Sequence, residues 1–281
     1  MRALNIALSA AATAAWLWAV PAAWASQPGA RDDAAPLERA RQAFFDARYE
    51  DAAAQALALR PAAPDDLAGY ELRTSALLFQ LKALLGDDKT KNQELKACGA
   101  CPDLLSAFQK DTAVAQALAR TRLRVEPSDE TALFFLGKVD LNHVWLHLGP
   151  LGRRTGWREY REAKDSLDAV LEDNPAHVRA RVARAWIDYI VDTRMPWGTK
   201  WLFGGGSRKR ALAAVREAAG TAGDFYDRAE ARFALWEMLV RERDLGAAID
   251  VARALTRDFP ANSQLARFVE SHEAAGSAPP E

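Results

Sequence analysis

The sequence predicts an all-α fold, an α-solenoid of helix hairpins with long inserted loops. Alternating patterns typical of β-strands are nearly absent along the 281 residues. Apolar and small residues instead recur three and four positions apart, which is the spacing of one helix face, as at Phe134, Gly137, Leu141, Val144 and Leu148. A small residue followed at a fixed distance by a helix-ending residue also recurs, which indicates a repeated hairpin.

The repeat is clearest near the C-terminal end, in the segment ARFALWEMLVRERDLGAAIDVARALTRDFPANSQL. This segment predicts a first helix, a tight turn at Arg243 and Asp244, and a second helix from Leu245 that ends before Pro260, because proline disrupts a helix interior. It resembles a tetratricopeptide repeat. In that family a small residue early in the second helix lets the first helix approach closely, and Ala248 matches that position.

The pair of Ala248 and Pro260, twelve residues apart, has counterparts earlier in the chain. The five alanines, counted up to Ala248, are separated by 63, 48, 48 and 37 residues. A tetratricopeptide repeat has a period of about 34 residues, so we expect the additional residues to form inserted loops. One counterpart has glycine where the others have proline, and glycine also ends helices. The sequence thus predicts about five hairpins across residues 37–270. The counterparts are Ala52 with Pro64, Ala115 with Pro127, Ala163 with Pro175, and Ala211 with Gly223.

Residues 1–25 have the pattern of a secretory signal peptide, with Arg2, an apolar run and the cleavage pattern Ala23-Trp24-Ala25. A retained membrane anchor is the alternative interpretation of the same run. We expect cleavage and a periplasmic location, because alanine is only weakly apolar and the cleavage pattern fits. Residues 26–36 and 271–281 are rich in Pro, Gly, Ala and charge, and they are predicted to be disordered tails.

Two inserted loops carry a local excess of cations, although the formal net charge of −1 argues against a dedicated nucleic-acid-binding protein. The insertions run from His147 to Arg161 and from Thr193 to Arg210, between the two helices of the third and fourth predicted hairpins. A shift of 48 residues places Gly156 on Gly204. Because stacked repeats put equivalent loops side by side, the two loops predict one basic, aromatic edge.

The residues of this basic aromatic edge suit anion binding. Arginine pairs with carboxylates and phosphates, and glycines at a helix start let backbone amides approach an anion, here at Gly204 to Ser207. Three interpretations stay open: turning and packing of a long hairpin, binding of an anionic peptide, lipid or small solute, and peripheral membrane contact. A P-loop is disfavoured, because no Gly-Lys-Ser/Thr ending and no preceding strand are present. The candidate residues are Arg153, Arg154, Trp157, Arg158, Arg194, Trp197, Lys200, Trp201, Gly204, Gly205, Arg208, Lys209 and Arg210.

The sequence Leu202-Phe203-Gly204-Gly205 also resembles a phrase found in exported bacterial repeat proteins, including those associated with TRAP-type solute transporters. Those proteins often carry Asp or Asn with Pro or Lys after the glycines, whereas Gly206-Ser207-Arg208 follow here. We therefore transfer no ligand site from them.

Cys98 and Cys101, in the sequence CGAC, are the two cysteines of the chain. A c-type haem attachment needs His where Pro102 stands, and thioredoxin-like chemistry needs a β-α-β scaffold that is not evident. In an exported chain we expect a local disulfide that closes the loop before a helix at Asp103. A labile thiol pair or half of a metal site are the alternatives.

The remaining candidate residues do not predict an enzyme. His143 and His147 lie on one helix face, a spacing that suits zinc, but no third ligand is evident. Packing of the two histidines near Trp145 is the expected role, and no metal or other cofactor is predicted. No nucleophile with a base and an acid, and no paired catalytic carboxylates, can be singled out.

The function predicted from the sequence is a periplasmic scaffold that binds a protein or peptide partner. The first helices of the hairpins are expected to form a concave binding surface, and the basic aromatic edge is expected to add selectivity. A solute- or lipid-binding component of an envelope transport system is the alternative function, with the two inserted loops as a lid.

Overall fold

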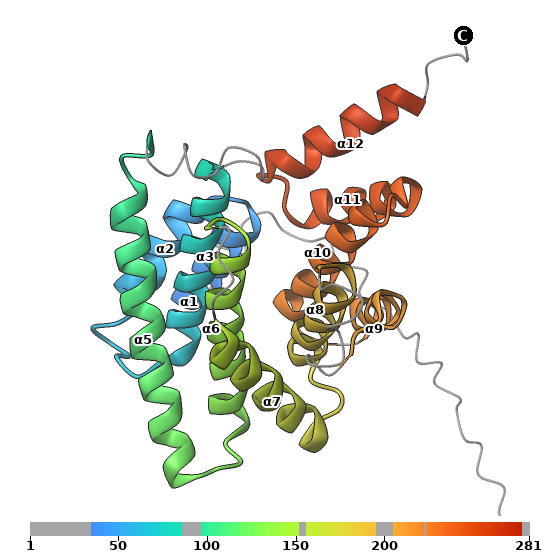
Figure 1. Ribbon diagram of the computed structural model, residues 1–281. Coiled ribbons are helices and arrows are strands. Elements are labelled where there is room, and N and C mark those ends of the chain that lie inside the picture. Colours follow the sequence, from blue (N-terminus) through green and yellow to red (C-terminus); the bar gives the residue numbers. More distant parts are fainter. Residues whose placement is uncertain (1–34, 86–96, 152–155, 195–204, 222, 277–281) are drawn as a thin grey trace, which may run out of the picture. The chain divides into compact units, whose positions relative to one another are not determined.

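The structure is a computed structural model that describes residues 35–85, 97–151, 156–194, 205–221 and 223–276. The predicted signal peptide lies outside these residues. All regular secondary structure within them is helical (Figure 1). The helices are α1 (Pro36–Phe45), α2 (Tyr49–Ala58), α3 (Leu67–Leu85), α5 (Cys101–Val125), α6 (Glu130–Leu148), α7 (Trp157–Asp173), α8 (Val178–Arg194), α9 (Arg208–Gly220), α10 (Phe225–Arg241), α11 (Leu245–Asp258) and α12 (Ser263–Gly276).

The helices of the described residues pair into consecutive hairpins, which confirms the predicted all-α fold. The pairs are α1 with α2, α3 with α5, α6 with α7, α8 with α9, and α10 with α11. We call the first helix of each pair helix A and the second helix B. Each helix B also contacts the next helix A, and successive A helices contact each other. The last helix, α12, packs on α11 and ends at Gly276, beyond the predicted boundary at residue 270.

The small residues that predicted the repeat are all buried early in, or within, the B helices. They are Ala52, Ala115, Ala163, Ala211 and Ala248, and none is more than 2% exposed. Gly137 of α6 shows why the positions must be small: a Cβ atom there would lie 2.8 Å from Cγ of Leu167 and 3.3 Å from the carbonyl oxygen of Ala163. The two helices of this hairpin therefore approach as closely as the repeat pattern predicts.

The predicted helix-ending prolines hold for three of the four hairpins. Pro127, Pro175 and Pro260 each follow directly after the residue that caps α5, α7 or α11. The first hairpin differs, because α2 already ends at Ala58 and Pro64 lies well beyond that end. The match between Ala52 and Pro64 was therefore right about the buried alanine and wrong about the proline.

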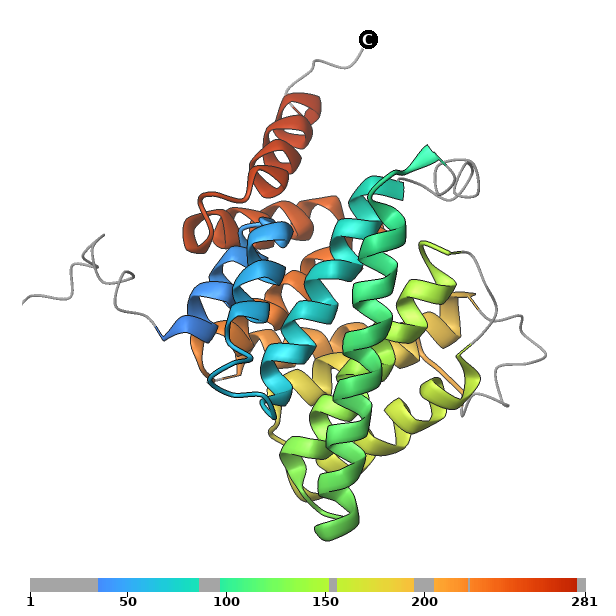
Figure 2. The same ribbon diagram turned by 90° about the vertical axis from the view of Figure 1, so that its left-hand side faces the viewer.

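Residues from opposite ends of the described chain are in contact. The ring of Phe45, at the end of α1, lies 5.3 Å from the ring of Phe233 in α10 and 5.3 Å from the ring of Phe259, which follows α11. The side-chain amide of buried Asn262 donates a hydrogen bond of 2.7 Å to the carbonyl oxygen of Phe45. Figure 2 shows α1 and α2, in blue, beside the last helices, in orange and red. The first hairpin thus contributes to the same apolar cluster as the last.

The A helices are joined by a largely buried network of four charged side chains. Arg179 of α8 pairs with Glu71 of α3 at 2.9 Å and with Glu230 of α10 at 2.5 Å, while Lys138 of α6 pairs with both carboxylates. None of the four side chains is more than 17% exposed. Burial disfavours ionisation of Glu230, but Arg179 and Lys138 outweigh it and hold its pKa below the usual value. The network is therefore charged and internally compensated.

Candidate functional site

The helix-A surface is not an open binding surface at the residues of this network. The prediction of a concave surface holding a peptide required A-helix side chains that are free to meet a partner. Glu71, Lys138, Arg179 and Glu230 are instead largely buried and paired with one another. These four side chains therefore satisfy each other across the A helices.

The described members of the predicted basic aromatic edge lie at the ends of three helices. Arg153, Arg154, Trp197, Lys200, Trp201 and Gly204 lie outside the described residues. Trp157 and Arg158 form the start of α7, and Arg194 is the last residue of α8. Gly205, Arg208, Lys209 and Arg210 lie at the start of α9.

The structure explains why two positions before α9 are glycines. Gly205 has a φ of +71°, a left-handed conformation that side chains disfavour. A Cβ atom on Gly206 would lie 2.5 Å from the carbonyl oxygen of Asp188 and 2.9 Å from the amide nitrogen of Asp192. The glycines thus let the chain turn and then pass directly over α8.

The start of α9 is already capped by oxygens of the protein itself. The Ser207 side chain accepts a hydrogen bond from the amide of Arg210, and Oδ2 of Asp192 accepts one of 3.0 Å from the amide of Arg208. The guanidinium of Arg208 lies 3.6 Å from a carboxylate oxygen of Glu242. Asp192 and Ser207 therefore satisfy two of the backbone amides at this helix start, and the predicted anion site at Gly204 to Ser207 stays a prediction.

Three described residues of the other insertion, Trp157, Arg158 and Arg161, line a groove between α5 and α7. The groove has a volume of about 840 Å³, and Leu136 of α6 forms part of its floor. Both walls are B helices, whereas the charged network joins A helices. Its lining combines apolar side chains, four arginines, two carboxylates and a hydroxyl, namely Leu123, Leu136, Trp157, Arg120, Arg124, Arg158, Arg161, Glu162, Asp165 and Ser166.

The arginines of the groove differ in how they are neutralised. Arg120 donates two hydrogen bonds, of 2.8 and 2.5 Å, to the carboxylate of Glu162 across the groove. Arg158 is 72% exposed and pairs with its neighbour Glu159. The guanidinium of Arg161 lies 5.1 Å from the ring centre of Trp157, and Arg124 donates to the hydroxyl of Thr121. Neither Arg124 nor Arg161 forms an ion pair with a described residue, so the groove presents two uncompensated cations.

A buried carboxyl group lies behind this groove. Asp140 of α6 is 0% exposed, and its Oδ1 accepts a hydrogen bond of 2.6 Å from the amide of Gln116. Burial raises the pKa of Asp140 to about 8, and the charge of Glu162 acts in the same direction. Hydrogen bonds from Arg120, by contrast, hold the pKa of Glu162 below its usual value. At neutral pH Asp140 is therefore neutral and the pair of Arg120 and Glu162 is charged.

Replacing Asp140 with Asn is expected to stabilise the protein increasingly as pH rises. Unfolding releases the proton of Asp140 above the unfolded pKa near 3.8, whereas the folded protein keeps it up to about pH 8. As pH rises across that range, the contribution of Asp140 to the free energy of unfolding therefore falls by at most about 1.4 kcal/mol per pH unit. Asn keeps an acceptor for Gln116 and does not titrate. Urea unfolding at several pH values measures the difference, and parallel pH profiles of the two proteins would contradict the assignment.

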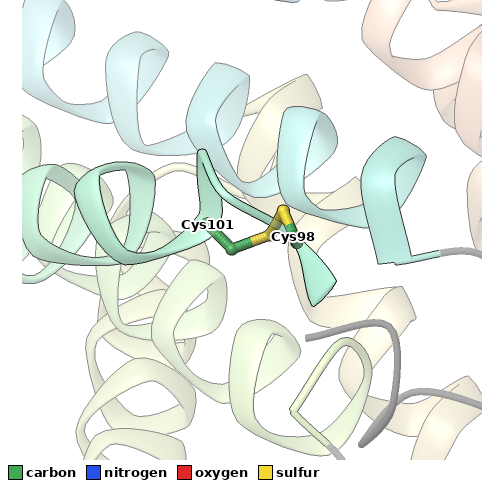
Figure 3. The surroundings of a disulfide bond; sticks show 2 residues. All are labelled: Cys98 and Cys101. Atoms are coloured by element: carbon green, nitrogen blue, oxygen red, sulfur yellow. A yellow bond between two sulfur atoms is a disulfide. The ribbon is translucent and has the colours of Figure 1, made fainter. Parts of the chain in front are cut away.

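The two cysteines form the expected disulfide (Figure 3), with a distance of 5.4 Å between their Cα atoms. Cys101 is fully buried in a cluster with residues such as Leu81 and Phe108. Helix α5 begins at Cys101 rather than at the predicted Asp103, with Pro102 in its first turn. The bond therefore closes the turn directly before α5, which is the structural role that the sequence predicted.

The histidine pair lies where a helix face was predicted. The rings of His143 and His147 lie 4.4 Å apart on α6, and burial lowers the pKa of His143. Within the described parts of the chain, no three His, Cys, Asp or Glu side chains gather as a metal site would require.

No described helix has the length and apolar character needed to cross a membrane.

The sequence interpretation missed the α5 wall of the groove. Arg120 and Arg124 belong to the run ARTRLR, in which arginines alternate near the end of a helix. That run was a usable signal, because arginines one helical turn apart share a face. It remained unnoticed because Arg120 and Arg124 lie within a helix, and the basic surface was predicted from the inserted loops alone.

Comparisons with known proteins add little to this site. No protein-family model matches the chain, and no curated protein matches it. Among solved structures, a thermophilic TPR protein of Thermus thermophilus matches with 15% sequence identity and a TM-score of 0.45. The match covers 84% of this chain and 96% of that chain.

Proposed function

We propose that this chain is an exported scaffold that binds a protein partner through the groove between α5 and α7. The observation that carries the proposal is the lining of this groove, where Arg124 and Arg161 stand beside Leu123 and Trp157. Arginine and tryptophan are the residues that most often contribute large shares of the binding energy at protein interfaces. The burial of the A-helix network supports docking on the B helices. The expected signal peptide supports export to the periplasm.

Affinity purification from envelope extract tests the binding function. The mature chain is compared with a groove variant carrying Arg124→Glu, Arg158→Glu and Arg161→Glu, and with a control variant carrying Arg208→Glu, Lys209→Glu and Arg210→Glu. We expect one partner to be retained by the mature chain and the control, and lost by the groove variant. Calorimetry with the purified partner then gives an affinity loss of about a hundredfold or more for the groove variant, since several charged contacts are reversed.

Other outcomes would redirect the proposal. Equal retention by both variants would place the interface elsewhere. Loss in the α9 control alone would restore the predicted basic aromatic edge. A stoichiometric solute or lipid in native mass spectra, without any protein partner, would favour the solute- or lipid-binding function. Cell fractionation and N-terminal sequencing of the exported protein test the periplasmic location.

A further inference from the structure

The charges of the groove point to the chemistry of the partner segment. Two of its four arginines already have carboxylate partners: Arg120 forms an ion pair with Glu162, and Arg158 forms one with Glu159. Arg124 and Arg161 have none among the described residues, and both are exposed. They stand on opposite walls, at the end of α5 and on the first turns of α7. A carboxylate that enters between them would gain charge-assisted hydrogen bonds without breaking an ion pair of the protein.

The apolar lining sets a second requirement. Trp157 is 41% exposed, whereas the other aromatic side chains among the described residues are buried or partly buried. Leu123, which is partly buried, lines the opposite wall of the groove, and the buried Leu136 lines its floor. A partner that covers these side chains removes apolar surface from water. A free inorganic anion or a lone headgroup phosphate would leave this part of the groove uncovered.

We infer that the groove between α5 and α7 binds an acidic, amphipathic segment of a protein, whose carboxylates meet Arg124 and Arg161 and whose apolar side chains cover Leu123 and Trp157. This inference rests on the proposed scaffold function and names the chemistry of its partner. The groove also carries an exposed carboxylate, Asp165, one helical turn after Arg161. Asp165 repels an acidic segment, so its removal strengthens binding. A merely structural role of the groove arginines gives no such gain.

The test uses two fluorescent synthetic peptides and the mature, disulfide-bonded chain. One peptide is an amphipathic helix of Leu and Glu, and the other has every Glu replaced by Gln. Fluorescence anisotropy is expected to give at least about tenfold tighter binding of the Glu peptide, since charge-assisted hydrogen bonds are each worth more than about 1.4 kcal/mol. The substitutions Arg124→Gln and Arg161→Gln should abolish that preference, and Asp165→Asn should tighten binding by about twofold or more. The preference should also weaken as salt is added.

The outcomes separate this inference from the proposed function. Equal binding of the two peptides, or no effect of Asp165→Asn, overturns the acidic segment even if a partner is found at the groove. A preference for the Glu peptide without any partner in the extract leaves the groove chemistry standing and removes the scaffold function. Preferential binding to phosphatidylglycerol vesicles, with none to either peptide, identifies a lipid surface and overturns the inference. Sedimentation of the chain alone identifies self-association, which overturns it as well. Circular dichroism of each variant confirms that it is folded.

Discussion

Replacing Arg179 with Met is expected to lower the free energy of unfolding by about 3–5 kcal/mol, as when one partner of a buried ion pair is removed. Arg179 separates two largely buried carboxylates, those of Glu71 and Glu230. Without it, Lys138 alone must compensate both charges. Urea unfolding of the wild type and the variant at neutral pH measures the loss. Met is close in length to the aliphatic part of arginine, so packing changes are small.

Two further variants separate buried charge from general loss of an ion pair. Arg232→Met breaks a more exposed pair with Asp258 and should cost about 1 kcal/mol or less. Adding Glu71→Gln and Glu230→Gln to Arg179→Met removes the uncompensated charges and should restore much of the stability. Equal losses for Arg179→Met and Arg232→Met would show that the network is not desolvated. Failure of the added substitutions to restore stability would show that arginine packing, rather than charge, stabilises the A helices.

Replacing Phe45 with Ala is expected to cost about 3–5 kcal/mol, as for other buried phenylalanines. The ring is 9% exposed and packs against Phe233 and Phe259 of the last hairpin. Its loss leaves a cavity between α1 and α10, and so weakens the contact between the two ends. Hydrogen exchange measures where protection is lost, and we expect faster exchange in both α1 and α10.

Phe45→Leu is the matched control for this substitution. Leucine fills most of the space, so its cost should stay below about 1.5 kcal/mol. Tyr226 offers a second check, because its hydroxyl donates to the carbonyl oxygen of Glu38 in α1. Tyr226→Phe removes that bond and keeps the ring, and it should cost about 1 kcal/mol. Faster exchange confined to α1 in the Phe45→Ala protein would contradict a contact that stabilises both ends.

The repeated hairpin could be predicted because its physical requirement is local. A helix B that approaches its helix A needs a small residue at the contact, and Ala163 and Ala248 meet that need with 0% exposure. The stop signals are local as well, as Pro175 and Pro260 show. The register of 48 residues also holds, because α6 begins at Glu130 and α8 at Val178.

The charged interior could not be predicted from the same pattern. Glu71, Lys138 and Arg179 each stand on a helix with acids and bases nearby in sequence, which is the usual composition of a solvated helix face. Their partners lie on other helices, and Arg179 and Glu71 are separated by 108 positions. Burial and long-range pairing depend on how the hairpins stack. The spacing of residues within one helix does not contain that information.

Only one wall of the groove could be predicted from the sequence, because the two walls come from different hairpins. Trp157 and Arg158 were selected because they belong to an inserted loop, and they do line a groove. The opposite wall, with Arg120 and Arg124, comes from a neighbouring hairpin with no basic insertion. Arg208 was selected by the same loop argument, but Asp192 and Glu242 approach it from α8 and the end of α10. Local charge in the sequence therefore identified cations without showing which of them the fold neutralises.

The contact between Phe45 and the last hairpin changes how this chain should fold and unfold. In an open repeat array each repeat touches only its neighbours, stability is a sum of nearest-neighbour terms, and end repeats fray first. Here the bond from Asn262 to Phe45 closes a separation of 217 residues and the bond from Tyr226 to Glu38 one of 188. Such contacts raise the contact order, which slows folding. They also make the end hairpins mutually dependent, so that the described helices are expected to unfold as one cooperative unit rather than from the two ends inward.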